Sequence, residues 1–319
     1  MSKKTTTCLL VASGLVVFGG LTFVATMTAC DWDFTKLNGK KYQTNTYEVN
    51  EVFDDISIQT DSTDIIFAPS EDGKCKVVCF ERENATTSVA VQNGKLTIDT
   101  IGERKWYEYI MNFDEPKTTV YLPEDDYASL YIQGDTSDIE IAKEFSFQSV
   151  EISVDTGDVK NCASVKEYVK IRTSTGDIQM ENASAGALDF SVTTGDVTLS
   201  NVNCEGDLKI SVSTGKSLLD GVVCKNLTSS GDTGDIQLKN VIAKETFCIE
   251  RSTGDVKFEK CDAAEIFVET DTGDVKGTLC SEKVFLPKTD TGKINVPKSV
   301  TGGKCEIITD TGDIILALA

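Results

Sequence analysis

Aspartate is the residue type in this chain whose spacing could create a metal-binding site, because it recurs directly after glycine in a Thr-Gly-Asp triplet. If successive copies stack, Asp158, Asp177 and Asp196 form a column of carboxylates, and oxygen ligands of this kind bind calcium. The structural alternative is a sharp turn in which glycine takes a positive φ and the aspartate accepts hydrogen bonds from backbone amides. Two carboxylates about 5 Å apart in water repel by only ~0.8 kcal/mol, so the column needs no metal. Because Lys216 and Lys293 replace aspartate in two copies, we expect the structural role and no metal site.

Other residues that carry chemistry are scarce. The chain has no histidine, the commonest general base and metal ligand, and its 11 cysteines form no Cys-x-x-Cys pair. The sequence therefore predicts no catalytic, cofactor-binding or metal-binding residue, and a protein that is not an enzyme. With 51 acidic against 31 basic residues, the formal net charge of −20 argues against nucleic acid as a partner.

Two cysteine pairs occupy equivalent positions in neighbouring copies, Cys204 with Cys224 and Cys261 with Cys280. Stacking would bring each pair of Cα atoms to ~4.8 Å, which is close enough for a disulfide. We expect buried thiols instead, because a free cysteine behaves as a small core residue.

The triplets belong to an internal repeat. From Ser137 onward the turn position recurs every 19 or 20 residues, and an earlier copy is centred on Thr63. We expect the turn glycines to be structural. They are Gly157, Gly176, Gly195, Gly215, Gly234, Gly254, Gly273, Gly292 and Gly312.

Apolar residues alternate on both sides of each turn. They stand seven and five residues before Gly157, at Val150 and Ile152, and two and four residues after Gly176, at Ile178 and Met180. This alternation predicts two short strands per copy, each with one buried face. Such strands can pair only with the same strands of neighbouring copies, so the sequence predicts an all-β, parallel β-solenoid with 19–20-residue coils. A third inward stack is expected seven residues after the glycine, at Ala183, Val202, Val222, Val241, Cys261 and Cys280.

Threonine precedes all nine turn glycines, and stretches such as Thr270-x-Thr272 resemble the threonine arrays of ice-binding solenoids. Alternation places these threonines on the same side as the buried residues upstream. We therefore expect them to pack and form hydrogen bonds inside the corner.

Residues 72–128 interrupt the repeat and contain several short strand patterns, including an Asn93-Gly94 hairpin signal. A solenoid must protect its open end from strand addition, so we expect this segment to be a cap. Its aromatic cluster Trp106, Tyr107 and Tyr109 is the candidate for partner contact.

The N-terminal segment predicts a membrane anchor. Residues 8–29 carry no charge and as a helix would span about 33 Å, roughly one bilayer core. The alternative is a lipoprotein-type signal ending at Cys30. Lys3 and Lys4 before the helix, with Asp31 after it, favour an N-terminus inside and the remainder outside the cytoplasm.

The last strand, residues 314–319, has no further coil behind it in the sequence. We expect an open edge there, with Ile314, Leu316 and Leu318 available for end-to-end self-association or for a partner strand.

The segment Ile56–Asp64 (ISIQTDSTD), the segment Thr119–Pro123 (TVYLP) and the corners from Asp155 to Asp158 onward resemble a bacterial β-strand-repeat family. It is called domain of unknown function 4097, or putative adhesin, and the N-terminal anchor is similar to that of Firmicute members. The resemblance implies a solenoid exposed on the cell surface. Some members are encoded beside regulators of cell-envelope stress.

The resulting organisation is an anchor (1–30), a linker (31–45), a first coil with a strand-rich cap (46–128) and the solenoid (129–319). The main functional hypothesis is a non-catalytic, adhesin-like scaffold in the cell membrane that binds an unknown protein or envelope partner. One alternative is an accessory protein of envelope-stress signalling that acts through a membrane partner. A carbohydrate-active β-helix enzyme fits less well, because the regular spacing leaves no room for the long loops of a cleft.

Overall fold

A computed structural model describes residues 3–29, 31–32, 42–83, 86–101 and 116–319. The chain divides into two compact units, of which the first comprises residues 1–43, 82–84 and 103–115. Its main described element is the helix α1 (Lys3–Ala29). The window Ala12–Ala29 has a mean hydropathy of 1.6, which is apolar enough to cross a membrane, although a signal sequence has the same character. The hydroxyls of Thr22, Thr26 and Thr28 donate to carbonyls one turn earlier, so these polar groups are satisfied within the helix.

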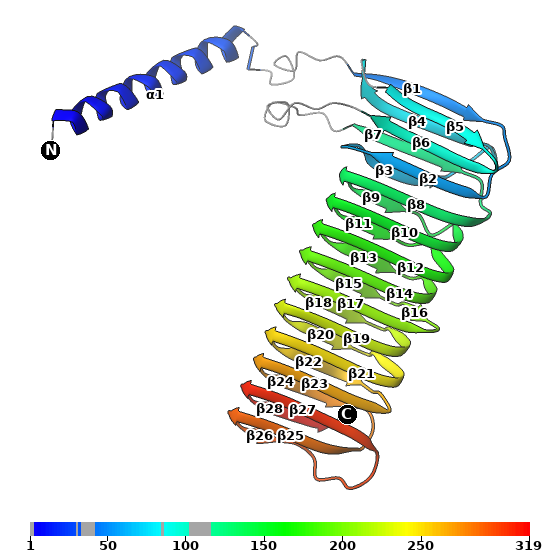
Figure 1. The fold of residues 1–319 in the computed structure, drawn as a ribbon, viewed down its shortest axis with the longest axis vertical. Coiled ribbons are helices and arrows are strands. Elements are labelled where there is room, and N and C mark those ends of the chain that lie inside the picture. The colour runs from blue at the N-terminus through cyan, green and yellow to red at the C-terminus, as the bar shows by residue number, and fades with distance from the viewer. Residues whose placement is uncertain (1–2, 30, 33–41, 84–85, 102–115) are drawn as a thin grey trace. The chain divides into compact units, whose positions relative to one another are not determined.

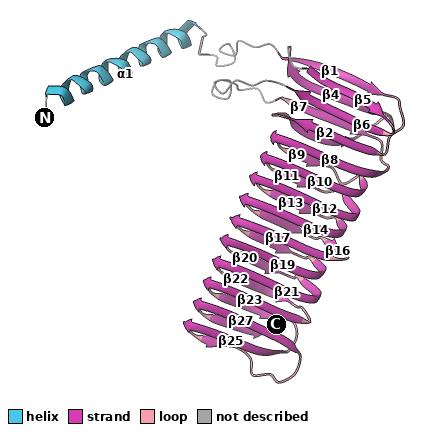
Figure 2. Cartoon of the chain, in the orientation of Figure 1, coloured by secondary structure: helices cyan, strands magenta, loops and turns pink. Residues whose placement is uncertain are grey.

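The second unit is built from strands (Figures 1 and 2). Its strands form two 14-stranded sheets among the described residues. In spatial order, the first sheet contains β1 (Tyr42–Val49), β4 (Cys75–Arg82), β7 (Lys117–Leu122), β3 (Asp64–Pro69), β9 (Ile139–Ile141), β11 (Val159–Asn161), β13 (Ile178–Glu181), β15 (Val197–Ser200), β18 (Ser217–Asp220), β20 (Ile236–Lys239), β22 (Val256–Cys261), β24 (Val275–Leu279), β28 (Ile314–Leu318) and β26 (Ile294–Asn295).

The second sheet faces the first across the core. In spatial order it contains β25 (Lys283–Thr291), β27 (Gly303–Thr311), β23 (Glu265–Thr272), β21 (Ile242–Thr253), β19 (Val223–Thr233), β16 (Asn203–Cys204), β14 (Ser184–Thr194), β12 (Ser164–Thr175), β10 (Ser146–Thr156), β8 (Asp126–Thr136), β2 (Asp55–Thr60), β6 (Lys95–Ile101) and β5 (Thr86–Gln92), while β17 (Asp207–Thr214) pairs with β14 and β19.

Each coil places one strand in each sheet and turns between them at the glycine corner. The strands pair in parallel with their equivalents, as Ile152 does with Ile171 and Val159 with Ile178. Inward side chains therefore stack in rows, and Ile152, Ile171 and Val159 are at most 1 % exposed. These pairings confirm the predicted parallel β-solenoid.

The N-terminal end of the second unit contains the strands of the segment expected to be a cap. The coil of Thr63 pairs directly with the coil of Ser137, although 74 residues separate the two turns in the chain. Among the described intervening residues, β6 pairs in parallel with β2 and β7 with β3, while β4 pairs antiparallel with β7 and β5 with β6. Asn93 and Gly94 have φ values of 52° and 76°, which confirms the hairpin signal. Strand β1 begins at Tyr42, inside the stretch expected to be a linker.

The C-terminal end differs from the prediction. Strand β28 lies between β24 and β26, and β27 lies between β23 and β25, so the last coil of the chain is inserted before the preceding coil. Ile314 and Leu316 are 0 % and 4 % exposed, and only Leu318 is exposed, at 40 %. The expectation that residues 314–319 form the outermost strand is therefore wrong, because β26 lies outside them and pairs with Ile314 and Ile315.

Proline explains the inserted order. Pro287 lies in β25 and has no backbone N–H, so this strand fits at the edge of a sheet, where one of its sides makes no ladder. The coil of β27 and β28 contains no proline and can pair on both sides.

The third inward stack is confirmed at its first five positions, where Val202, Val222, Val241 and Cys261 are at most 1 % exposed and Ala183 is 6 % exposed. Cys280 is exposed, contrary to the prediction. The pairing of β22 with β24 shifts between Phe258 and Cys261, so that Leu279 lies opposite Cys261. Leu279 thus fills the core position expected for Cys280.

Candidate functional site

The Thr-Gly-Asp corners have a structural explanation in the stacked backbones. A Cβ atom built on Gly176 would lie 2.1 Å from the carbonyl oxygen of Gly157, and one on Gly195 would lie 2.1 Å from that of Gly176. Gly176 and Gly195 also have φ values of 135° and 141°, which side chains rarely allow. Both the backbone conformation and the close approach therefore require glycine here.

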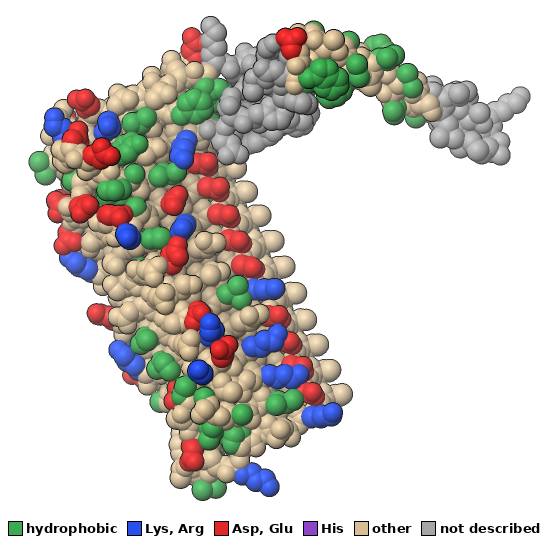
Figure 3. All heavy atoms as spheres, turned by 180° about the vertical axis from the view of Figure 1, so that it is seen from behind, with side chains coloured by type: hydrophobic (Ala, Val, Ile, Leu, Met, Phe, Trp, Pro, Cys, Tyr) green, Lys and Arg blue, Asp and Glu red, His purple; other side chains and the backbone are tan. Residues whose placement is uncertain are grey.

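The aspartates join neighbouring coils. Oδ1 of Asp158 accepts the backbone N–H of Asp177 at 2.7 Å, and Oδ1 of Asp177 accepts that of Asp196 at 2.8 Å. Figure 3 shows acidic side chains aligned in a column along the rod, with lysines interspersed. The described residues include no group of three acidic or cysteine side chains placed to hold a metal ion.

The threonines before the glycines are exposed in all nine copies, contrary to the expected inward packing. The strand ends at this point, and the backbone still continues the ladder, as the carbonyl of Thr175 accepts the N–H of Gly157 at 2.9 Å. The alternation of buried and exposed side chains therefore ends two residues before these threonines, at positions such as Thr173.

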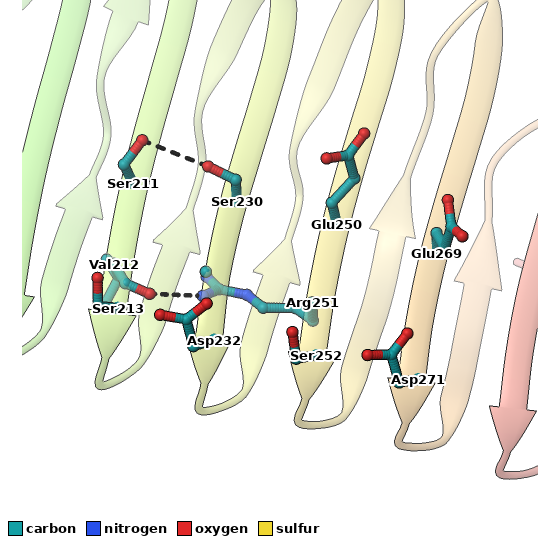
Figure 4. A pocket seen from close by; sticks show the side chains of 11 residues that line it. Ser211, Val212, Ser213, Ser230, Asp232, Glu250, Arg251, Ser252, Glu269 and Asp271 are labelled. Atoms are coloured by element: carbon teal, nitrogen blue, oxygen red, sulfur yellow. Dashed lines mark hydrogen bonds between the residues drawn. The ribbon is translucent and has the colours of Figure 1, made fainter.

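The most distinctive polar site is a groove of about 410 Å³ on the second sheet, which we call the arginine groove. It crosses β17, β19, β21 and β23 just before their corners, and Arg251 contributes to its lining (Figure 4). The groove is lined by Ser211, Val212, Ser213, Ser230, Gly231, Asp232, Glu250, Arg251, Ser252, Glu269 and Asp271.

Arg251 is 4 % exposed although it carries a charge. Its side chain reaches over two coils, where Nη1 donates to the carbonyl oxygen of Val212 at 3.0 Å. Nη2 donates to the hydroxyls of Ser217 at 3.0 Å and Ser229 at 3.4 Å. Its Nε is buried and has no hydrogen-bond partner. The guanidinium is therefore held in place through Nη1 and Nη2.

The neighbouring coils are adapted to this cation. Gly231 stands where most other copies carry a side chain, and a Cβ atom there would lie 1.8 Å from Nη1 of Arg251. Ser217 and Ser229, at 0 % and 2 % exposed, occupy row positions that are apolar in most other copies. Val212 and Gly231 are also missing from the parallel pairing of β17 with β19. At this point the carbonyl oxygen of Val212 accepts a hydrogen bond from the guanidinium of Arg251. Three coils thus combine to accommodate one arginine.

The electrostatics of the groove combine one buried cation with an acidic rim. Burial lowers the pKa of Arg251 to about 10, and the carboxylate of Asp232 opposes this shift, so the guanidinium stays charged at neutral pH. Figure 4 shows Asp232 beside the guanidinium. Asp232, Glu250, Glu269 and Asp271 are all exposed, so the opening is acidic.

Sequence reasoning did not single out Arg251. The available signal was the simultaneous loss of apolar residues at Ser217, Ser229 and Gly231, in rows that are otherwise regular. The position three residues before the turn holds valine or threonine in most coils, but Arg251 in one. This long side chain is the one that can fill the space left by the smaller residues.

The residues predicted for partner contact fall into two groups. Trp106, Tyr107 and Tyr109 lie outside the described residues. Ile314 and Leu316 are buried in the core of the inserted coil.

Comparisons with known proteins agree with this architecture. The family model described as Toastrack DUF4097 matches residues 53–215 and 205–319. No curated protein matches the chain.

Solved structures of similar fold include a putative adhesin from Parabacteroides merdae, 14% identical, covering 88% of this chain and 97% of its own, with a TM-score of 0.52. A second putative adhesin, from Parabacteroides distasonis, is 14% identical, and the match covers 87% of this chain and 98% of that one, with a TM-score of 0.50. A putative lipid binding protein from the same species is also 14% identical, and the match covers 88% of this chain and 98% of that one, with a TM-score of 0.48. At these identities the likeness concerns the fold alone.

Proposed function

Because the chain belongs to the Toastrack DUF4097 family, we propose that it is a membrane-anchored, non-catalytic interaction module displayed outside the cytoplasm of a bacterial cell. Two structural neighbours of similar fold, both called putative adhesins, agree with an interaction role.

The arginine groove is the observation that carries this proposal. Its lining offers serine hydroxyls and carboxylates for recognition of a partner. The groove lies on strands that have a neighbour on each side in the second sheet, and the pairing of β17 with β19 is interrupted within it, at Val212 and Gly231.

The N-terminal helix supports the anchored, outward orientation. Its apolar window is long enough to cross a bilayer, and the basic residues Lys3 and Lys4 precede it while Asp31 follows. The acidic solenoid would then face the outside of the membrane.

The test is a binding experiment with the full-length protein in detergent micelles. Purified cell-wall sacculi and protein-containing membrane vesicles are sedimented separately with it, and the bound fraction is measured. We expect binding to the sacculi. Binding only to membrane vesicles, abolished by protease treatment of the vesicles, would instead favour the signalling accessory. Binding to neither would refute the interaction role.

A further inference from the structure

We infer that the edges of β5 and of residues 44–49 in β1 form a self-association surface, where a second copy of this chain docks by strand pairing. Both strands lie at the same end of the second unit (Figure 1). The inference goes beyond the proposed function and is independent of what the arginine groove binds. Its basis is that the two sheets end one strand out of step, in strands without edge protection.

The two sheets end unequally. Beyond the coil of β2 and β3, the second sheet adds β6 and β5, whereas the first sheet adds β7, β4 and β1. Strands β6 and β7 form one level of the stack because they pair with β2 and β3, and β5 and β4 form the next level. Among the described residues, the second sheet therefore has no strand opposite β1.

The inner side chains of β1 agree with this overhang. Val49 is buried, but Asn45 and Tyr47, which point the same way by alternation, are only half-buried. Both reach back to the preceding level, where Nδ2 of Asn45 donates to Oε1 of Glu81 at 2.6 Å and the hydroxyl of Tyr47 donates to the carbonyl oxygen of Thr87 at 3.3 Å. Within the part of the chain that the structure describes, the inner face of β1 is thus covered from one side only.

These edge strands lack the features that prevent strand addition. The seven residues of β5 include neither a charge nor a proline, and residues 44–49 of β1 contain Glu48 as their one charge. The outermost strands at the C-terminal end differ, because β25 contains Pro287 and the buried Lys283, and β26 has only two residues. Natural proteins usually protect long edge strands, so unprotected edges at one end indicate a pairing surface.

The overhang selects a second copy as the partner. A half rotation about an axis along the strands brings the first sheet of a second copy into line with the second sheet of the first copy. Strand β1 of the second copy then lies opposite β1 and beside β5, and β1 of the first copy lies beside β5 of the second in the same way. Each overhanging strand covers the inner face of the other, so the contact closes as a symmetric dimer. Direct pairing of β5 with β5 would instead place β1 of one copy at the level of β4 of the other.

The same rotation predicts the register. Tyr47 lies at about the height of Thr87 along the strands, because its hydroxyl reaches the carbonyl of that residue. Rotation about an axis along the strands keeps this height, so Tyr47 of one copy would lie beside Thr87 of the other. Both side chains point inward, and the inward rows therefore continue from one copy into the next.

The net charge of −20 on each copy opposes association. The paired edges themselves bring only Glu48 from each copy, and charges further than a Debye length, about 10 Å at 0.1 M salt, are largely screened. Repulsion between the rods therefore does not prevent contact at these ends.

The first test is sedimentation velocity of the full-length protein in density-matched detergent micelles over the micromolar range. We expect a monomer–dimer equilibrium. Val89→Lys places a charge on the partly buried side of β5, as Lys283 does in β25, and should weaken dimerisation at least tenfold. The matched control Leu286→Lys adds the same charge to the outermost strand at the other end, where Leu286 is 46 % exposed, and should leave dimerisation unchanged. Melting curves establish that both variants are folded.

The second test is cross-linking, which does not depend on how Val89→Lys folds. In a Cys280→Ser background, Ser88→Cys on β5 is combined with Thr46→Cys or with Glu48→Cys on β1, and all three substituted positions are exposed. Within one copy, position 88 and the β1 positions belong to different sheets and face outward, so a bridge can form only between copies. We expect mild oxidation to give a dimer with one of the two pairs, identified by peptide mass spectrometry, and no dimer with Ser88→Cys alone.

Each other outcome overturns the inference. A wild type that stays monomeric refutes self-association, and a dimer that persists in Val89→Lys would place the contact elsewhere, such as in the anchor helix. Equal weakening by Leu286→Lys would show that added charge acts without regard to position. A bridge in Ser88→Cys alone would show β5 pairing with itself. A monomer whose binding to protein-containing membrane vesicles is lost in Val89→Lys would assign the edge to a strand of another protein, and the interaction role would stand.

Discussion

At the scale of single residues, two effects can require glycine at a corner: a positive φ, and the short distance to the carbonyl oxygen of the neighbouring coil. The short distance applies to more of the corners than the positive φ does. Gly273 and Gly312 lack the positive φ of the other corner glycines. A Cβ atom on either would nevertheless lie 1.9 Å from the carbonyl oxygen of the coil before it. Glycine is thus required because each corner rests directly on the one below.

Gly254→Ala tests this distinction, because Gly254 has both a φ of 149° and a predicted Cβ contact of 2.1 Å with the carbonyl oxygen of Gly234. We expect a loss in unfolding free energy of about 3 kcal/mol or more. The matched control Gly94→Ala also has a positive φ, 76°, but open space around its Cβ, and should cost only about 1–2 kcal/mol. Thermal and denaturant unfolding of both variants give the comparison. Equal losses would show that conformation alone matters.

The aspartate column predicts a different pair of effects. Oδ1 of Asp255 accepts the backbone N–H of Asp274 at 3.0 Å, and the amide oxygen of asparagine can replace it. Asp255→Asn should therefore cost less than about 1 kcal/mol, and Asp255→Ala about 1 kcal/mol more than Asn. Melting is measured with and without calcium. A rise in melting temperature with calcium in the wild type, absent in Asp255→Asn, would contradict a purely structural column.

The corner residues were predictable from sequence, whereas Arg251 and the threonines were not. Glycine and aspartate recur with a period that one chain displays by itself. The outward position of Thr175 depends on where the strand ends, and period-two alternation does not contain that information. The burial of Arg251 depends on space left by Gly231 and Ser229 in another coil, so it follows only from a comparison of whole rows.

At the scale of elements, the two ends of the solenoid are closed by different means. At the N-terminal end, β4 and β5 pair antiparallel with the outermost coil, and local signals such as Asn93-Gly94 predicted this. At the C-terminal end, the coil of β25 and β26 carries Pro287 and lies outermost. Lys283 of the same coil is 3 % exposed and forms an ion pair with Asp262 at 2.7 Å. Proline and an inward charge both discourage addition of a further strand.

The inserted order could not be predicted from spacing, because the step from Gly292 to Gly312 is 20 residues, like the steps before it. The proline in β25 was the only local sign that this strand avoids the sheet interior. Paired registers confirm the insertion, since Ile308 lies opposite both Glu269 and Lys288.

A disulfide test distinguishes inserted from sequential stacking. In the observed order, Glu269→Cys with Ile308→Cys places two cysteines on adjacent strands, at a Cα separation of ~4.8 Å that permits a bridge. The matched pair Glu269→Cys with Lys288→Cys would be adjacent only in sequential order. We expect the first pair to cross-link under mild oxidation, as measured by peptide mass spectrometry, and the second to remain reduced. The reverse result would show that the coils stack in chain order.

At the scale of the whole molecule, the stacked coils explain why so few residues carry specific chemistry. Each coil contacts mainly its neighbours, so stability accumulates along the rod and the outer rows are free to vary. A local change such as the arginine groove can therefore be accommodated within three or four coils. The orientation of the protein in the membrane is argued from the charged residues around the N-terminal helix and not from the coils.

Cys280 makes that orientation testable in the intact chain. Cys280 is the exposed cysteine among residues 42–83, 86–101 and 116–319, whereas Cys204 and Cys224 are 0 % exposed, with pKa values raised by burial to about 11 and about 12. Because a thiolate is the reactive form, a membrane-impermeant maleimide at pH 7 should label Cys280 in preference to the buried thiols. If residues 31–319 lie outside the cytoplasm, cells stripped of their wall should be labelled as strongly before lysis as after it. The control Cys280→Ser should lose most of this signal, which identifies the labelled residue. Labelling of Cys280 only after lysis would place the solenoid inside the cell, and the proposed role at the cell surface would then fail.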